Sequence, residues 1–168
     1  MSEFRQEILE KAAADNKADN KMANSTELRK TLSYKIRSST DQITSTVKNL
    51  DHLLNDLKCC SAREKSEIST ALSEALANAI IHGNRIKPDK IVSLQIDIFN
   101  NRIELRITDS GSGFDPKKIQ NPTNPENILK NNGRGIYLMS IFMDDVKFVR
   151  LKQGMRVILT KYFHKKKN

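Results

Sequence analysis

The chain has 168 residues and a mass of 19.1 kDa, which is the size of one ordinary domain. Hydrophobic residues make up 38% and charged residues 29%, so the chain can form a core and is not expected to be fully disordered. No apolar run reaches the roughly 18 residues of a membrane helix, and no apolar secretory segment follows Met1. The only two cysteines, Cys59 and Cys60, are adjacent and cannot form a disulfide that closes a loop. We expect a reduced, cytoplasmic protein with no membrane partner.

The net charge of +9 comes almost wholly from the end of the chain. Residues 147–168 hold eight basic and no acidic side chains, which leaves 21 basic and 20 acidic ones in residues 1–146. Aromatic residues make up only 5% and Trp is absent, so a stacking platform for nucleic acid is not expected. We interpret residues 164–168 as a solvated basic tail, with contact to an acidic protein or to nucleic acid as the alternative.

The first half of the chain predicts an extension, a strand and two helices. Residues 1–26 have few large apolar groups after Leu9 and are interpreted as a mobile extension. Alternation over residues 28–37 predicts a half-buried strand. Apolar residues at helical spacing then predict a helix over residues 43–57, after a capping-box pattern that begins at Ser39. A second helix is expected from the capping box at Ser61 and Glu64 to a stop at Gly83.

The second half predicts two hairpins separated by a long loop and a short helix. Alternating segments at 92–98 and 103–107 predict the first hairpin, with a tight turn at Asn100-Asn101 because Asn tolerates positive φ. The polar, proline-containing residues 115–133 predict a lid, since so long a loop is usually functional. A helix over 136–143 and strands over 146–151 and 155–162 follow. This order predicts an α+β two-layer sandwich over residues 27–163, with a mostly antiparallel mixed sheet and the helices on one face.

One segment places three polar side chains at helical spacing. Glu74, Asn78 and His82 are four residues apart, so a regular α-helix would stack them along one side. A carboxylate and an amide one turn apart can serve as a general base and as an oxygen ligand to a hard cation such as Mg²⁺. Taken alone, such a segment is more often a polar helix flank that bonds to water.

A second segment begins where the second hairpin strand ends. Asp109 is followed by Gly111 and Gly113, which let the backbone approach a flat ligand. The Asp109 carboxylate can then accept hydrogen bonds from an exocyclic amine. An ordinary turn of glycine and serine residues is the alternative.

A third segment opens the last predicted helix. Gly133 and Gly135 flank Arg134, and the free N–H groups of a helix start form an anion site suited to phosphate. A plain helix start after a loop is the alternative. The combination of all three segments in this order is far more specific than any one of them.

The three segments resemble the N, G1 and G2 boxes of the Bergerat-fold (GHKL) ATPases, a superfamily that includes gyrase, the histidine kinases and MutL-type proteins. The run from Glu74 to Gly83 reads Glu-Ala-x-x-Asn-Ala-x-x-His-Gly and is similar to the serine-protein kinase anti-sigma factor branch. Residues 142–146, Phe-Met-Asp-Asp-Val, and the lid residues 115–130 also resemble that branch. The resemblance covers roughly residues 28–163 and implies a Bergerat-type fold with ATP between the helices and the lid.

The resemblance also implies a role for each matching residue. Glu74 would be the base that activates the attacking hydroxyl, and Asn78 would bind both the nucleotide and its Mg²⁺. Asp109 would read the adenine amino group, with Gly111 beside it and Gly113 closing on the base.

The phosphates would lie against Gly133, Arg134 and Gly135. Some members of the branch carry Arg before the last box, where this chain has Lys130 followed by two asparagines. Either Lys130 or Arg134 is therefore expected to contact the γ-phosphate.

This resemblance implies an ATP-dependent serine/threonine-protein kinase that uses Mg²⁺ and phosphorylates a small anti-sigma antagonist of STAS type. Such a protein also sequesters a sigma factor or a similar regulator, and members of the branch are commonly homodimers. The alternative is a non-catalytic protein-binding switch gated by ATP and ADP. The presence of Glu74 favours the kinase, because a pure binder has no need of a base there.

Overall fold

The computed structural model describes residues 27–111 and 134–164. The strands are β1 (Leu28–Arg37), β2 (Ile91–Phe99), β3 (Arg102–Thr108), β4 (Asp145–Arg150) and β5 (Met155–Tyr162). The helices are α2 (Asp41–Leu57), α3 (Ala62–Ala77), the π-helix η1 (Asn78–Gly83) and α5 (Arg134–Phe142). The predicted extension at residues 1–26, most of the predicted lid and residues 165–168 of the tail lie outside the described residues.

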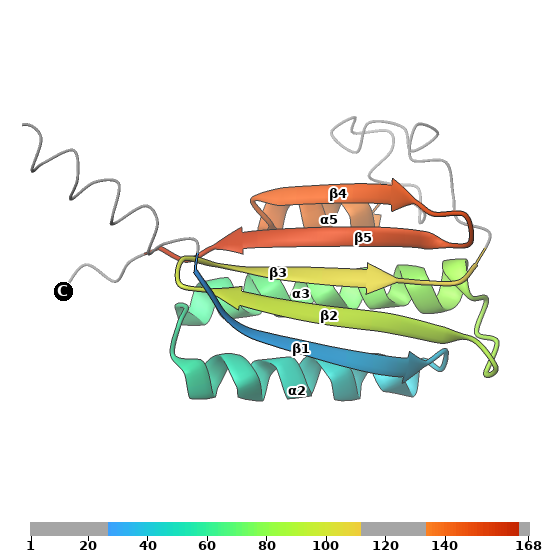
Figure 1. The fold of residues 1–168 in the computed structure, drawn as a ribbon, viewed down its shortest axis with the longest axis horizontal. Coiled ribbons are helices and arrows are strands. Elements are labelled where there is room, and N and C mark those ends of the chain that lie inside the picture. Colours follow the sequence, from blue (N-terminus) through green and yellow to red (C-terminus); the bar gives the residue numbers. More distant parts are fainter. Residues whose placement is uncertain (1–26, 112–133, 165–168) are drawn as a thin grey trace, which may run out of the picture.

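The described strands form one sheet in the order β1-β2-β3-β5-β4, and each pairing is antiparallel. The helices α2, α3 and α5 all lie on the same side of this sheet (Figure 1). The predicted α+β sandwich is therefore confirmed, and the part of the sheet that is described contains no parallel pair. No described helix is long and apolar enough to span a membrane.

The core fills the space between the sheet and the helices. Alternate residues of β2 and β3 point toward the helices, as the period of two in the sequence predicts. Leu94 and Leu105 in the sheet and Leu72 in α3 are at most 1% exposed. Helix α3 crosses the middle of the sheet and is buried along much of its length, so it is the most strongly fixed helix in the domain (Figure 1).

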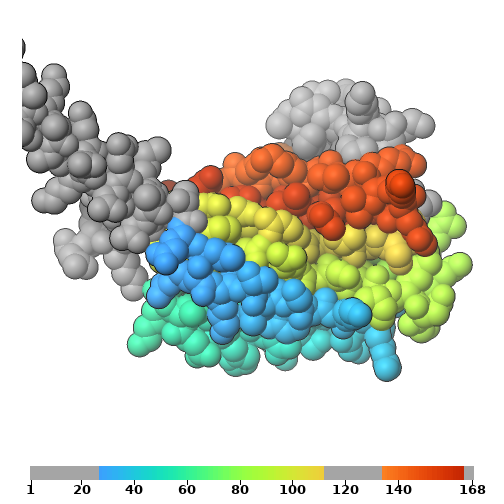
Figure 2. Space-filling view, viewed as in Figure 1, coloured from blue at the N-terminus to red at the C-terminus, as the bar shows by residue number. Residues whose placement is uncertain are grey.

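The opposite side of the sheet carries polar side chains. Arg106 on β3 pairs with Asp97 on β2 and with Glu104 on its own strand. Figure 2 shows this side, where the strands make up most of the visible surface and α2 is seen only along the lower edge. Among the described residues, the hydrophobic core cluster lies between the sheet and its helices.

The two predicted capping boxes have different outcomes. At the start of α3, Ser61 Oγ accepts from the Glu64 N–H (3.2 Å) and Ser61 N–H donates to Glu64 Oε2 (2.6 Å), so this box is confirmed. The box predicted from Ser39 is wrong, because Thr40 is the N-cap of α2 and makes no side-chain cap bond. The Ser39 hydroxyl donates instead to the Asp41 carboxylate.

The turn between β2 and β3 forms where predicted, but for a different reason. Neither Asn100 nor Asn101 has a positive φ. The turn is held by the neighbouring chain segments, since Asn100 N–H donates to Glu27 O (3.2 Å) and Phe163 N–H donates to Asn101 O (2.8 Å). Tertiary hydrogen bonds therefore replace the expected left-handed turn geometry.

Helix α3 continues directly into η1, and the two together are called the long helix below. Its geometry changes from α to π at Asn78. Asn84 N–H donates to the carbonyl of Ala79, five residues earlier, which is the spacing of a π-helix (2.8 Å). Gly83 ends the helix, as predicted. The wider turn departs from the regular α-helical spacing on which the predicted stack of Glu74, Asn78 and His82 rests, and His82 is exposed while Glu74 and Asn78 are half-buried.

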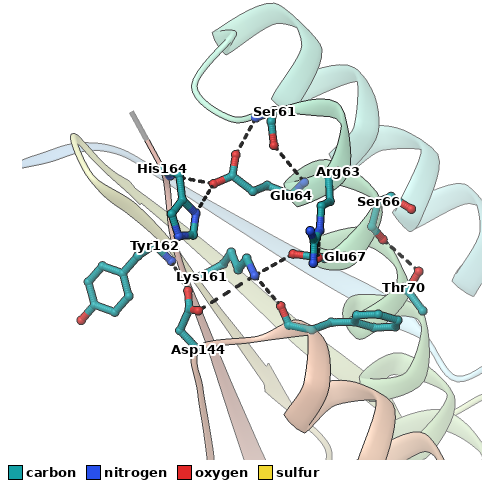
Figure 3. A network of polar contacts seen from close by, with 11 residues as sticks. Ser61, Arg63, Glu64, Ser66, Glu67, Thr70, Asp144, Lys161, Tyr162 and His164 are labelled. Atoms are coloured by element: carbon teal, nitrogen blue, oxygen red, sulfur yellow. Dashed lines mark hydrogen bonds and ion pairs between the residues drawn. The ribbon is translucent and has the colours of Figure 1, made fainter. Parts of the chain in front are cut away.

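A polar network at the other end of α3 joins this helix to β5 and α5 (Figure 3). The side chain of Lys161 is only 8% exposed, and its ammonium group pairs with Glu67 (2.7 Å) and donates to the Phe142 carbonyl (2.8 Å). Asp144 lies 4.0 Å from the same ammonium group. Because Phe142 ends α5, Lys161 fixes the end of that helix to α3.

Glu64 connects the start of α3 to the end of β5 (Figure 3). Its Oε1 accepts from the His164 N–H (2.7 Å) and lies 3.0 Å from His164 Nδ1. Burial alone would raise the pKa of Glu64, but the hydrogen bonds from His164 and Ser61 lower it to about 2. The carboxylate is therefore stabilised in its ionised form by Ser61, just before α3, and by His164, just after β5.

We expect Glu64→Gln to lower the free energy of unfolding by no more than about 3 kcal/mol at pH 7. This limit follows from the lowering of the Glu64 pKa from the ordinary 4.5 to about 2 in the folded protein. A carboxylate whose pKa is lower in the folded state stabilises the fold at pH values above its unfolded pKa. The difference in unfolding free energy between variant and parent should therefore shrink as the pH falls from about 5 toward 2. Urea unfolding at pH 7 and pH 3.5 measures this, with the exposed Asp56→Asn as control. A pH-independent difference would contradict the assigned role of the charge.

Candidate active site

The N-terminal end of α5 packs against the side of the long helix that carries Glu74 and Asn78. A Cβ built on Gly135 would lie 2.6 Å from Glu74 Oε2 and 3.7 Å from Asn78 Nδ2. Any larger residue at position 135 would displace the Glu74 carboxylate. The structure therefore brings together the predicted residues of the first and third segments, with the exposed Arg134 beside them at the first residue of α5.

The Asn78 side chain has an unsatisfied polar atom. Its Nδ2 is buried and has no hydrogen-bond partner among the described residues. A buried amide group left without a partner costs roughly 1–3 kcal/mol, so such an atom marks a place where a ligand is expected. Because rotation of the amide exchanges its nitrogen and oxygen, the same position can present an oxygen ligand to Mg²⁺.

Glu74 is only half-buried, in contrast to its apolar neighbours Ala75 and Leu76. A groove of about 500 Å³ between α2 and α3 has Glu74 in its lining, together with polar residues that include Asp51, Ser69 and Ser73. Glu74 is thus held against α5 on one side and open to a polar groove on the other. A base that must meet a hydroxyl from outside the domain needs this combination of fixed position and access.

Asp109 lies at the end of β3 and is 8% exposed. Its Oδ1 accepts from Gly111 N–H (2.8 Å), and its own N–H donates to Met155 O on β5 (3.0 Å). Burial raises the pKa of Asp109, and the Gly111 N–H and the charge of Lys90 oppose that effect in part. The carboxylate is therefore a desolvated acceptor, which favours a ligand that donates a hydrogen bond.

Two glycines that are not among the predicted site residues pack against Asp109. A Cβ on Gly83, the last residue of the first segment, would lie 2.6 Å from Asp109 Cγ. A Cβ on Gly154, which lies between β4 and β5, would lie 1.9 Å from the Asp109 carbonyl oxygen. Gly154 also has φ +91°, a conformation that favours glycine. Turn and stop signals in the sequence locate these glycines but cannot show that they meet at Asp109.

The described residues thus include six of the nine predicted site residues: Glu74, Asn78, Asp109, Gly111, Arg134 and Gly135. They form two groups: Gly135 lies against Glu74 and Asn78, with Arg134 next to it in the chain, while Asp109 and Gly111 lie against Gly83. Gly113, Lys130 and Gly133 lie outside the described residues. Within the described part of the chain, no group of three or more His, Cys, Asp or Glu side chains could hold a metal ion.

The sequence matches a known family over most of its length. The family model described as a histidine kinase-like ATPase domain covers residues 36–161. The chain belongs to the histidine kinase-like ATPase family. This membership confirms the resemblance to Bergerat-fold ATPases that the three segments indicate.

Several curated members of the family are similar to the chain. It is 40% identical over 109 residues to the anti-sigma F factor of Halalkalibacterium halodurans, an alignment that spans 62% of this chain and 73% of that protein. It is 35% identical over 104 residues to the anti-sigma F factor of Clostridium botulinum, spanning 60% and 73% of the two chains. It is 27% identical over 106 residues to the serine-protein kinase RsbW of Listeria innocua, spanning 60% and 67%.

A solved structure of the RsbU and RsbW domains of a Mycobacterium tuberculosis protein has the same fold. The TM-score is 0.58 at 12% sequence identity, and the match covers 79% of this chain. It covers 32% of the solved chain, so the histidine kinase-like ATPase described here spans about a third of that protein. The likeness supports the fold alone.

We expect Gly154→Ala to lower the free energy of unfolding by about 1–3 kcal/mol, because the methyl group would meet the rigid carbonyl of Asp109 at a positive φ. Urea unfolding at pH 7 measures the change. The exposed neighbour Gln153→Ala serves as the control and should change stability by less than about 0.5 kcal/mol. Equal costs for the two substitutions would show that Gly154 is not constrained by Asp109.

Proposed function

We propose that this histidine kinase-like ATPase is an ATP-dependent serine/threonine-protein kinase of the anti-sigma factor type. The observation that carries the proposal is the position of the Glu74 carboxylate. It lies one helical turn before Asn78, against Gly135 and open to a polar groove. The curated names of the similar proteins, anti-sigma F factor and serine-protein kinase RsbW, agree with this activity.

The nucleotide is ATP in this proposal. The buried Asp109 carboxylate accepts a hydrogen bond from the adenine amine, with Gly111 and Gly113 beside the base. Asn78 would hold Mg²⁺, since its amide is the unsatisfied polar group at this position. The cation, when bound, neutralises charge on the phosphates.

The proposed phosphate contacts come from the start of α5 and the residues before it. Gly133, Arg134 and Gly135 approach the phosphates, as the N–H groups of a helix start favour an anion. Arg134 is exposed at the first residue of α5, where its charge is free to turn toward the nucleotide. Lys130 is the second candidate for the γ-phosphate.

The chemistry needs one proton acceptor and correct positioning. A Ser or Thr hydroxyl of the partner enters through the groove between α2 and α3 and gives its proton to Glu74. The hydroxyl oxygen forms a bond to the γ-phosphorus while the bond from that phosphorus to the bridging oxygen breaks, which leaves ADP. Glu74 acts only on the hydroxyl, so it contributes to transfer and little to nucleotide binding.

The proposed protein substrate is a small anti-sigma antagonist of STAS type. The same chain would bind a sigma factor or a similar regulator, as the name of its anti-sigma F factor relatives indicates. We further propose that the protein acts in the cytoplasm, as a homodimer.

The second candidate function is a binding switch that responds to ATP and ADP without transferring phosphate. A non-catalytic switch needs the nucleotide contacts of Asn78 and Asp109 but not a carboxylate at Glu74. The access of Glu74 to the groove favours the kinase. Both functions require the same ATP site, so binding of ATP alone cannot distinguish them.

Replacing Glu74 with Gln removes the base and keeps the size of the side chain. We expect phosphate transfer to fall by at least about 10²-fold, because general bases contribute about 10²–10⁴-fold, while Mg-ATP affinity changes by less than about threefold. Transfer from radiolabelled ATP to the purified partner and calorimetry for ATP measure the two effects.

Asp56→Asn is the matched control, since this carboxylate is exposed on α2. Transfer at the parental rate by Glu74→Gln would exclude Glu74 as the base. A parent protein that transfers no phosphate, yet changes its affinity for the partner between ATP and ADP, would support the switch.

Replacing Asn78 with Ala tests the proposed metal contact. We expect the variant to lose at least about tenfold in ATP affinity with Mg²⁺ and less than about twofold in EDTA, because the amide acts through the cation. Calorimetry under both conditions measures the difference. A loss of the same size with and without Mg²⁺ would show that Asn78 is only structural.

A further inference from the structure

Asn84 connects three separate parts of the domain. It is the first residue after η1 and is 0% exposed. Its Nδ2 donates to Ser38 Oγ, just beyond β1 (2.6 Å), and its Oδ1 accepts from both the N–H (3.0 Å) and the hydroxyl (3.2 Å) of Ser110. One buried amide therefore joins the end of β1, the end of the long helix and the turn that contains Asp109.

The orientation of this amide is fixed at both ends. Ser38 is also 0% exposed, and its N–H donates to Lys90 O (3.2 Å), which holds it in place. The backbone N–H of Asn84 donates to Ala79 O (2.8 Å), so the main chain is fixed as well. An amide that is fully buried and bonded on both sides has a single favoured position.

Ser110 is held from a second direction by Lys90. The ammonium group of Lys90 donates to the Ser110 carbonyl oxygen (3.1 Å). The N–H, hydroxyl and carbonyl groups of Ser110 thus all have partners, and those partners are the side chains of Asn84 and Lys90. Neither of these side chains belongs to the three segments that predict the nucleotide site.

Ser110 directly follows Asp109, so its position sets the direction of the Asp109 carboxylate. That carboxylate lies between Gly83, which precedes Asn84, and the N–H of Gly111. A small rotation of the Ser110 peptide would move both the Asp109 side chain and the Gly111 N–H. The hydrogen bonds of Asn84 oppose this rotation.

We propose that Asn84, supported by Lys90, is a positioning residue for base selection, which aims the Asp109 carboxylate at a purine that carries an exocyclic amine at C6. This inference rests on the proposed function, in which Asp109 accepts from that amine. A keto oxygen at C6 has no hydrogen to donate and repels a carboxylate. A fixed carboxylate therefore rejects the keto purine, while a loosened one turns away and loses selectivity.

Calorimetry on the 168-residue chain with ATP and with inosine triphosphate tests the proposal. The two nucleotides differ at C6 and at the neighbouring N1, which carries a hydrogen only in the keto purine, so the ratio of their affinities reports recognition of this edge of the base. We expect Asn84→Ala to lower this ratio by about tenfold, mostly through weaker ATP binding, as one positioned hydrogen bond is lost. Asn84→Asp keeps an acceptor for Ser110 and should restore the ratio to within about threefold of the parent.

Two further substitutions separate positioning from a general loss of stability. Ser38→Ala breaks the other end of the same bridge and should leave the ratio within about twofold of the parent. In the background of Asp109→Asn, Asn84→Ala should have no further effect on the ratio, because both changes act through the same carboxylate.

The half-buried Lys90 provides a variant that leaves the core intact. Lys90→Met should lower the ratio by about two- to fivefold, since it removes the second contact to Ser110 and also the positive charge that favours the ionised form of Asp109. Any effect of its charge on the phosphates would change both affinities equally and cancel in the ratio. If Asn84→Ala does not fold, this variant decides the question.

The proposal is overturned if Asn84→Ala weakens both nucleotides equally, or if the ratio stays at the parental value in Lys90→Met when Asn84→Ala does not fold. A parent protein that binds both nucleotides with equal affinity would contradict the adenine contact of Asp109 and thus the proposed nucleotide site. That result differs from an equal loss in the variants of a selective parent, so the two failures are distinguishable.

Discussion

The close approach of two backbone segments is the constraint on which the candidate site depends. Gly83, at the end of the long helix, touches the Asp109 carboxylate, and a Cβ on Gly111 would lie 1.9 Å from the Gly83 carbonyl oxygen. No side chain fits between these segments, so the helix end and the turn after β3 are in direct backbone contact. The π geometry of η1 brings Gly83 to this position, and the hydrogen bonds of Asn84 hold the contact together.

The long helix is shared by every part of the site. Its middle carries Glu74 and Asn78, its end supports the turn at Asp109, and its first turns carry Glu64 and Glu67, which bind the end of the chain. Lys161 then fixes the end of α5 to this same helix, so the start of α5 is held beside Glu74. Because one buried helix orients the Glu74 carboxylate, the Asn78 amide and the start of α5, their relative positions depend on the core and not on loops alone.

The two acidic residues of the site have environments that suit different tasks. Asp109 is buried and bonded to the backbone, which suits recognition of a donor in a flat ligand. Glu74 is half-buried beside a groove, which suits exchange of a proton with a hydroxyl that arrives from outside. In the proposed function, this difference in solvent access separates recognition, by Asp109 as a fixed acceptor, from chemistry, by Glu74 as the proposed base.

The sequence by itself determined the elements that depend on local chemistry. The alternation of β2 and β3, the capping box at Ser61 and the three segments that bear the site all follow from residue spacing, which acts over a few neighbours. Only the tertiary structure decided the α-to-π change at Asn78, which turns His82 to solvent, and the meeting of Gly83 and Gly154 at Asp109. It also decided the role of Asn84, which is an unremarkable polar residue in the sequence. These features depend on contacts between segments tens of residues apart, and spacing along the chain carries no information about which backbones will touch.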